Sequence, residues 1–245
     1  MSITSLTAPQ RRVVGVLIEK SLTTPSNYPL SLNAVTTGCN QKSNRDPVVE
    51  YVEEETDRIL EELKGLGLMT VVYPASGRVE KYRQELSSLL DLDGQEMAVL
   101  AELLLRGAQS VGELRTRASR MKGIADLNEL DRVLGQLAGR DHPLVVRLTP
   151  EGVKRGVRYT HNLYEAGELE RVRQGEPAPA AEAAPAAPVS SGAGLAADGA
   201  PAAPAPASRG VSGGGGAKVD ALERQIKELT ERLEIVEGRL GIDVD

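Results

Sequence analysis

The chain contains two copies of one sequence pattern, and this internal repeat constrains the fold more than any other feature. Arg58-Ile-Leu-Glu-Glu-Leu63 is followed by Val71-Val72, and 74 residues later Arg132-Val-Leu-Gly-Gln-Leu137 is followed by Val145-Val146. Solenoid repeats are about 20–50 residues long, so a longer period indicates two related domains rather than an array of small modules.

Each copy predicts three helices and then a two-stranded hairpin. In the first copy, Thr7-Ala-Pro-Gln10 matches a capping box that starts a helix, and apolar spacing continues that helix through residue 18. The other elements expected in this copy are a helix at 31–39, a third helix marked by apolar side chains from Thr56 to Leu63 and ending at Gly65 or Gly67, and strands at 68–73 and 78–82.

The second copy has clearer helix starts. Three of its segments place Glu three residues after Ser or Asp, the capping-box spacing: Asp93-Gly-Gln-Glu96, Ser110-Val-Gly-Glu113 and Asp126-Leu-Asn-Glu129. Strands are expected at 144–148 and 157–161. Three short helices with a hairpin are typical of the winged helix. We therefore expect a mainly α fold with small β-hairpins (α+β), built from two tandem winged-helix domains at 5–88 and 91–165.

The C-terminal third predicts a linker and a coiled coil. Residues 174–217 hold 7 of the 14 Pro and 9 of the 25 Gly, without apolar periodicity, which favours a disordered linker. Residues 218–241 carry apolar side chains at alternating spacings of 3 and 4, the heptad pattern. Because only about three heptads are present, we expect weak self-association as a homo-oligomer, dimeric or trimeric, or pairing with a helix of a partner protein. Docking of this helix on its own domains is the alternative.

Composition excludes several classes of function. The chain has one Cys, two His, six Tyr, no Phe and no Trp. It therefore lacks an intrachain disulfide and offers few rings on which single-stranded nucleic acid could stack. No apolar run approaches the 18–20 residues that span a membrane. We expect a cytoplasmic, non-enzymatic protein without cofactor or metal, in which Cys39 is a small buried side chain and no membrane is bound.

Several long segments resemble the YceH-like family of uncharacterised bacterial proteins. They are Leu17-Ile-Glu-Lys20, Thr24-Pro-Ser-Asn-Tyr-Pro29, Cys39-Asn-Gln-Lys-Ser-Asn-Arg-Asp-Pro47, Leu103-Leu-Leu-Arg-Gly-Ala-Gln109 and Gly112-Glu-Leu-Arg-Thr-Arg-Ala-Ser-Arg-Met121. The resemblance covers about residues 5–165 and leaves out the linker and the C-terminal helix. It implies a tandem winged-helix fold, but it implies no activity and assigns no functional residue.

Charge differs between the two copies. Residues 46–62 hold eight acidic side chains and one base, Arg58. The run Glu53-Glu54-Glu55-Thr56-Asp57 fits the first turn of a helix, where the helix dipole favours carboxylates. This third helix is the one that a DNA-binding winged helix places in the major groove, so the first copy should be a poor DNA reader.

The second copy is basic, with 11 bases and 6 acids over residues 106–158. Its candidate nucleic-acid contacts are Arg115, Arg117, Arg120, Lys122, Lys154, Arg155 and Arg158. A solvated basic face without a ligand is the alternative. A polar loop in the first copy adds Lys42, Asn44 and Arg45 as candidate contact residues, with a turn bonded to its own backbone as the alternative.

These features leave two hypotheses of function. The first is a regulatory or architectural protein that contacts duplex DNA through the second copy. The second is a protein–protein adaptor that uses the winged helices without DNA. Residues 1–173 hold 23 bases and 24 acids, and this near-neutral balance favours the adaptor, because it provides no long-range attraction for a polyanion.

Overall fold

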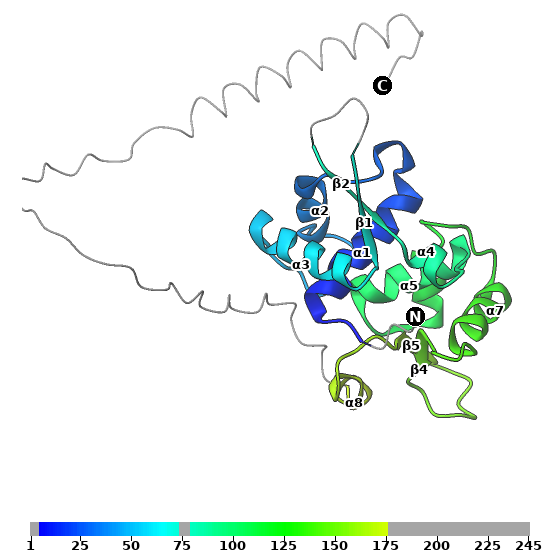
Figure 1. Ribbon diagram of the computed structural model, residues 1–245. Coiled ribbons are helices and arrows are strands. Elements are labelled where there is room, and N and C mark those ends of the chain that lie inside the picture. The colour runs from blue at the N-terminus through cyan, green and yellow to red at the C-terminus, as the bar shows by residue number, and fades with distance from the viewer. Residues whose placement is uncertain (1–4, 74–78, 176–245) are drawn as a thin grey trace, which may run out of the picture. The chain divides into compact units, whose positions relative to one another are not determined.

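The computed structural model describes residues 5–73 and 79–175, whose arrangement is shown in Figure 1. Within them are eight α-helices, a short 3-10 helix and two small antiparallel sheets. The first repeat comprises α1 (Ala8–Thr23), η1 (Pro25–Asn27), α2 (Leu32–Cys39), α3 (Glu53–Gly65), β1 (Met69–Val72), β2 (Lys81–Gln84) and α4 (Leu86–Leu89). The second comprises α5 (Gly94–Arg106), β3 (Gln109–Ser110), α6 (Val111–Ala118), α7 (Leu127–Ala138), β4 (Val145–Arg147), β5 (Arg158–His161) and α8 (Glu168–Arg173).

The prediction of helices combined with small antiparallel hairpins is confirmed. Both repeats belong to one compact unit, and their division into domains at 5–88 and 91–165 stays a prediction. The linker at 174–217, beyond its first two residues, and the coiled coil at 218–241 lie outside the described residues.

Side-chain caps start the helices where the sequence predicts them. The Thr7, Asp93 and Ser110 side chains accept from the backbone N–H three residues on, and Gln or Glu at that position bonds back. Asp126 also caps α7, but Glu129 accepts from the N–H of Ala125 at 2.6 Å instead of completing the box. Each cap satisfies backbone donors that a helix start leaves open.

The two repeats share a strand arrangement. In the second, β5 lies between β3 and β4 in an antiparallel sheet. In the first, β1 pairs with β2, and an isolated bridge from Leu30 to Tyr82 takes the place of the third strand. Strand β2 begins at Lys81 rather than at residue 78 as expected, and β3, α4 and α8 have no counterpart in the sequence prediction.

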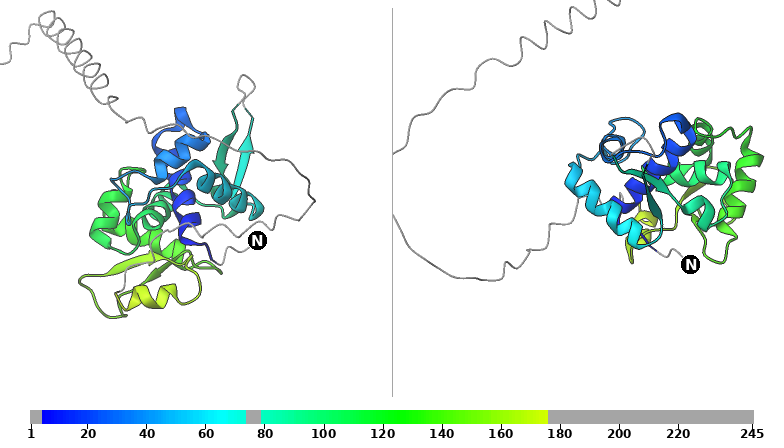
Figure 2. Two further views of the ribbon diagram at one scale, coloured as in Figure 1. Left: turned by 90° about the vertical axis from the view of Figure 1, so that its left-hand side faces the viewer. Right: turned by 45° about the horizontal axis from the view of Figure 1, so that its top comes forward.

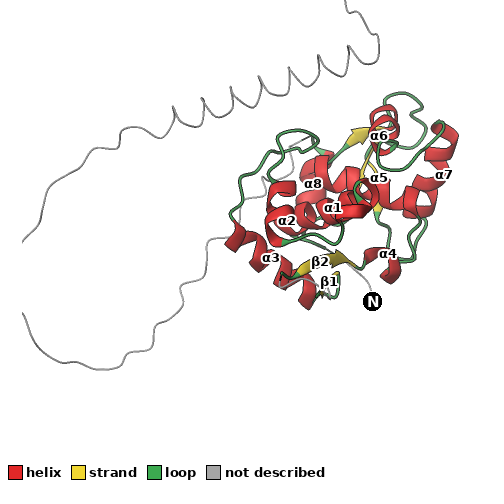
Figure 3. Cartoon of the chain, turned by 90° about the horizontal axis from the view of Figure 1, so that it is seen from above, coloured by secondary structure: helices red, strands yellow, loops and turns green. Residues whose placement is uncertain are grey.

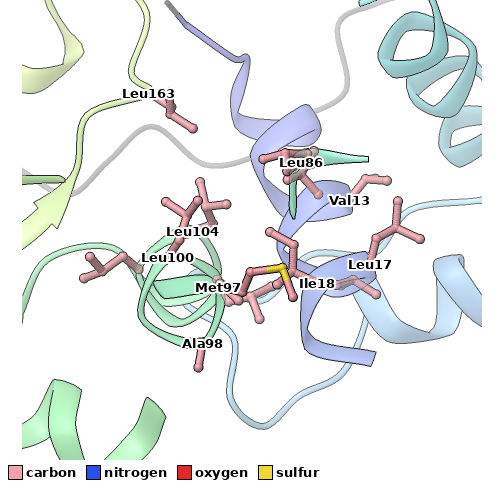
Figure 4. Close-up of a cluster of buried hydrophobic side chains, with 14 of the residues drawn as sticks. Val13, Leu17, Ile18, Leu86, Met97, Ala98, Leu100, Leu104 and Leu163 are labelled. Atoms are coloured by element: carbon pink, nitrogen blue, oxygen red, sulfur yellow. The ribbon is translucent and has the colours of Figure 1, made fainter. Parts of the chain in front are cut away.

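The repeats join through their first helices, since α1 packs on α5. Figure 4 shows Leu17 and Ile18 of α1 in one apolar cluster with Met97 of α5 and Leu163. The helices approach closely at Gly15, where an added Cβ would lie 2.9 Å from the Leu105 side chain. Because both repeats contribute to one core, their relative orientation is fixed by packing.

The segment after the second hairpin returns to the start of α1. Leu6 donates its N–H to the carbonyl of Leu163 at 3.1 Å, and the guanidinium of Arg11 forms two bonds to Glu168, at 2.7 and 3.1 Å. Arg11 also lies over the ring of Tyr164. This contact places α8, which follows the predicted end of the second domain at residue 165, against α1.

Candidate nucleic-acid interface

The candidate basic residues of the second repeat come from α6, the turn after it, and the β4–β5 hairpin. Strand β3 leads directly into α6 and pairs with β5, so Arg158 at the start of β5 lies beside the start of α6. In Figure 3, α6 lies beside α5 and α7, and the contacts between these helices agree. The sheet and the helix packing therefore bring segments that are about 40 residues apart into one region.

Arg117 and Arg158 surround one carboxylate. Arg117 donates to Gln109 at 2.7 Å and pairs with Glu113 at 3.3 Å. Hydrogen bonds from Ser110 lower the pKa of Glu113, and the positive charges of Arg117 and Arg158 lower it further. Arg158 also donates to the carbonyl of Ala108, a bond that leaves its charge uncompensated. Glu113 thus offsets one of the two positive charges.

The turn after α6 carries exposed bases. Arg115 donates to the carbonyl of Ala125 at 3.2 Å and fixes this turn. Arg120 and Lys122 are exposed, and neither side chain has a hydrogen bond or ion pair to residues 5–73 and 79–175. The aliphatic stem of Lys122 passes over Gly94, where an added Cβ would lie 3.2 Å from it. The stem is packed while the ammonium group reaches water.

The loop between β4 and β5, which we call the second wing (residues 148–157), presents the other bases. Arg147 donates to the carbonyl of Val153 at 2.6 Å, and the N–H of Arg158 donates to the hydroxyl of Thr149. These bonds order the loop. Lys154 and Arg155 at its end are exposed and have no bond to the part of the chain that the structure describes.

Arg45 corrects the prediction for the contact loop. Lys42 and Asn44 are exposed as expected, but Arg45 is 5% exposed. Its guanidinium bonds both carboxylate oxygens of Glu19, at 3.1 and 2.6 Å, and its Nε donates to the carbonyl of Gly38. A side chain held in this way cannot reach a ligand, so Arg45 is a structural residue of the loop.

The same loop lies against the second repeat, which the sequence does not indicate. The N–H of Asp46 donates to the carbonyl of Leu105, and Arg106 at the end of α5 donates to Asn44 at 3.3 Å. The guanidinium of Arg12 donates hydrogen bonds to the carbonyls of Cys39 and Pro47, at the two ends of this loop. Burial lowers the pKa of this guanidinium. Arg106 is therefore a basic side chain at this edge that the sequence analysis missed.

Carboxylates mark the start of the third helix in both repeats. Glu53, Glu54 and Glu55 form the first turn of α3, as expected. In the second repeat, Asp126 and Glu129 flank the start of α7. The positive charge of the second repeat therefore resides on α6, the following turn and the wing, and the start of its third helix is acidic.

Cys39 and His161, whose side chains could take part in catalysis, are buried, and His142 is exposed. Burial raises the pKa of the Cys39 thiol to about 12, so the thiol is protonated at neutral pH. Burial lowers the pKa of His161 well below its usual value. Within residues 5–73 and 79–175, no three His, Cys, Asp or Glu side chains gather as metal ligands would. None of the helices there combines the length and apolar character that crossing a membrane requires.

Comparison with known proteins identifies the family. Residues 6–154 match the family described as "Protein of unknown function, DUF480", which is more than half of the chain. The chain belongs to the DUF480 family. The YceH-like resemblance seen in the sequence is thereby confirmed.

Relatives within the DUF480 family are bacterial. A UPF0502 protein of Geobacter sulfurreducens is 52% identical over 157 residues, 64% of this chain and 70% of the relative. The UPF0502 protein YceH of Escherichia fergusonii is 40% identical over 241 residues, 96% of this chain and 98% of the relative. The family model ends at residue 154, within the expected range of 5–165, whereas the alignment to YceH covers 96% of this chain and extends beyond that range.

Proposed function

We propose that this chain is a non-enzymatic protein of two tandem winged helices that associates with duplex DNA through the second repeat. The observation that carries the proposal is a set of exposed bases on the turn after α6 and on the second wing whose side chains have no partner within residues 5–73 and 79–175: Arg120, Lys122, Lys154 and Arg155. In helix-turn-helix proteins, such loops and wings lie next to the helix that enters the groove.

The arrangement of elements supports the winged-helix part of the proposal. The second repeat runs helix, short strand, helix, helix, hairpin, and its short strand pairs with the second strand of the hairpin. The first repeat follows the same order, with the Leu30–Tyr82 bridge in place of the short strand. One scaffold thus occurs twice with different surface charge.

The proposed contact is with the phosphate backbone rather than with bases. The carboxylates at the start of α7 repel phosphates, so this end of the helix is poorly suited to enter a DNA groove. Long basic side chains on exposed loops instead suit phosphates, and such contacts position a protein without reading sequence. Each phosphate neutralised on duplex DNA changes the slope of log affinity against log salt by about −0.9.

The adaptor remains the second candidate, and the first repeat favours it. The exposed side of α3 is acidic, and the adjoining hairpin exposes Tyr73 at 71%. Aromatic side chains are enriched in protein interfaces. In this alternative, both repeats bind proteins and the basic side chains of the second repeat contact carboxylates.

Binding of a fluorescent duplex, followed by anisotropy from 50 to 300 mM salt, tests the proposal. For the full chain we expect affinity to fall steeply with salt, and Lys154→Glu with Arg155→Glu to remove most of it. The matched control is Lys64→Glu with Arg83→Glu, exposed bases of the first repeat with the same charge change. The placement of the DNA surface would be refuted if both double variants lost the same amount of DNA affinity. It would also be refuted if the Lys154 and Arg155 variant bound DNA as well as the unmodified chain.

A further inference from the structure

The hairpin of the first repeat exposes an aromatic ring beside carboxylates. Tyr73 is 71% exposed, whereas the other five tyrosines are at least partly buried. Its hydroxyl donates to Glu80 at 2.9 Å. The chain has no Phe or Trp, so exposed aromatic side chains can only be tyrosines. A solvent-exposed Tyr such as Tyr73 is a side chain of the kind that anchors protein interfaces.

Strand register shows which way this ring points. Val71 pairs with Tyr82 on the face toward the core, and side chains alternate along a strand. Tyr73 and Glu80 therefore continue the same face beyond the core. The hydroxyl of Tyr82 reaches Asp57 of α3 at 3.5 Å, so α3 borders this face.

Charges on the neighbouring turn of α3 complete the surface. Glu61 pairs with Lys64 at 3.0 Å, and the charges of both residues act on the pKa of Tyr73. Glu61 raises the pKa of Lys64, and Tyr73 and Glu80 raise it further. We call this surface, made of Asp57, Glu61, Tyr73 and Glu80, the acidic wing face. It holds three carboxylates, and Lys64 at its border partly compensates their charge.

The second repeat presents the complementary surface at the corresponding place. Val153, at 42% exposure, precedes the exposed Lys154 and Arg155 on the second wing. We call these three residues the basic wing face. Each surface thus combines one exposed side chain, Tyr73 or Val153, with a net charge, and the two net charges have opposite signs.

One copy cannot bring its own two faces together. The β1–β2 hairpin and the β4–β5 hairpin lie at opposite ends of the described residues in Figure 1 and in the left view of Figure 2. The packing of α1 on α5 between them is part of the common core, so the two hairpins cannot fold toward each other without unpacking it.

We propose that the acidic wing face of one copy binds the basic wing face of a second copy. The contact is head-to-tail, because it joins two different surfaces and leaves one of each kind open. It uses Lys154 and Arg155, so duplex DNA competes with it for the basic wing face. The contact does not depend on DNA binding and exists without DNA.

Charge reversal with complementation tests this contact in the full chain. The first variant, Glu61→Lys with Glu80→Lys, has two basic faces. The second, Lys154→Glu with Arg155→Glu, has two acidic faces. We expect each variant alone to self-associate roughly tenfold more weakly than the unmodified chain at low salt, because like charges now meet. An equimolar mixture should recover the lost association.

Sedimentation velocity without DNA, at 20 and 300 mM salt, gives the readout. Any association through residues 218–241 is the same in every variant, so the differences report the wing contact. Glu50→Lys with Glu54→Lys, exposed acids outside the acidic wing face, is the matched control and should leave association unchanged. Tyr73→Ala should weaken association without a change of charge, and circular dichroism verifies that each variant is folded.

The inference is overturned if the equimolar mixture associates no more than the two variants do separately. It is also overturned if the Glu50 and Glu54 control variant weakens association as much as the Glu61 and Glu80 variant does. The outcome is distinct from that of the DNA proposal. The Glu61 and Glu80 variant keeps the basic wing face, so it should bind duplex DNA at least as well as the unmodified chain even where the wing contact is lost.

Discussion

Replacing Arg45 by Ala should destabilise the protein strongly, although Arg45 lies in a loop. All five N–H groups of its guanidinium have acceptors: both oxygens of Glu19, the carbonyls of Gly38 and Asn44, and the side chain of Gln41. Removing one partner of a buried ion pair costs about 3–5 kcal/mol.

The lower end of that range applies here. The Glu19 side chain keeps 13% exposure, and Lys20 remains 3.3 Å from its carboxylate, so the stranded charge is partly solvated and partly compensated. We therefore expect a loss of about 3 kcal/mol. With a urea dependence of about 2 kcal/mol per molar, the unfolding midpoint should fall by about 1.5 M.

Urea unfolding followed by circular dichroism measures the effect, with Lys42→Ala as the control. Lys42 is exposed in the same loop, so its removal should change stability by less than about 0.5 kcal/mol. Arg45→Lys should fall between the two, because one ammonium cannot replace the two-point bond to Glu19. If Arg45→Ala left the midpoint unchanged and lowered DNA affinity instead, Arg45 would be a ligand contact and the structural argument would be refuted.

Three further outcomes are expected. Deletion of residues 218–245 should lower the apparent mass in solution; an unchanged monomer before and after deletion would disprove the coiled-coil prediction. Cys39 should not react with a thiol reagent at pH 8 until the protein unfolds, because burial raises its pKa to about 12; rapid reaction of the folded chain would contradict this. Because burial lowers the pKa of His161, the unfolded state binds its proton more readily. Stability should therefore decrease as pH falls below about 6.5, less steeply in His161→Gln than in the exposed-site control His142→Gln.

Local signals predicted much of the fold. A helix start depends on a few neighbouring residues, so Thr7, Asp93 and Ser110 could be assigned as caps from spacing alone, and the structure confirms them. The hairpins also followed from short apolar runs around turn residues. The ends of the strands could not be predicted in this way. The register of β1 and β2 depends on how the strand that carries Tyr82 pairs with its neighbour, and not on the turn alone.

The roles of individual arginines could not be predicted in this way. Arg11 and its partner Glu168 are separated by 157 residues, and Arg45 finds Glu19 on a different helix. Nothing near them in the sequence distinguishes these arginines from Arg120, which is exposed. Burial of a charged side chain depends on a partner supplied by tertiary packing, so the candidate surface could be listed from the sequence but not separated from structural charges.

The contrast between the two repeats depends on their wings more than on their third helices. Carboxylates start both α3 and α7 because a helix N-terminus favours them, so acidity there follows from folding and need not report a ligand. Lys154 and Arg155 have no such role, since they make no bond within residues 5–73 and 79–175, and within the same residues the Glu80 carboxylate accepts its hydrogen bond from the exposed Tyr73. Side chains that the fold does not use are those free to serve binding. The sign of the charge on the acidic wing face and on the basic wing face, rather than the acidic run at residues 46–62, is therefore the feature by which the partner of each repeat should be identified.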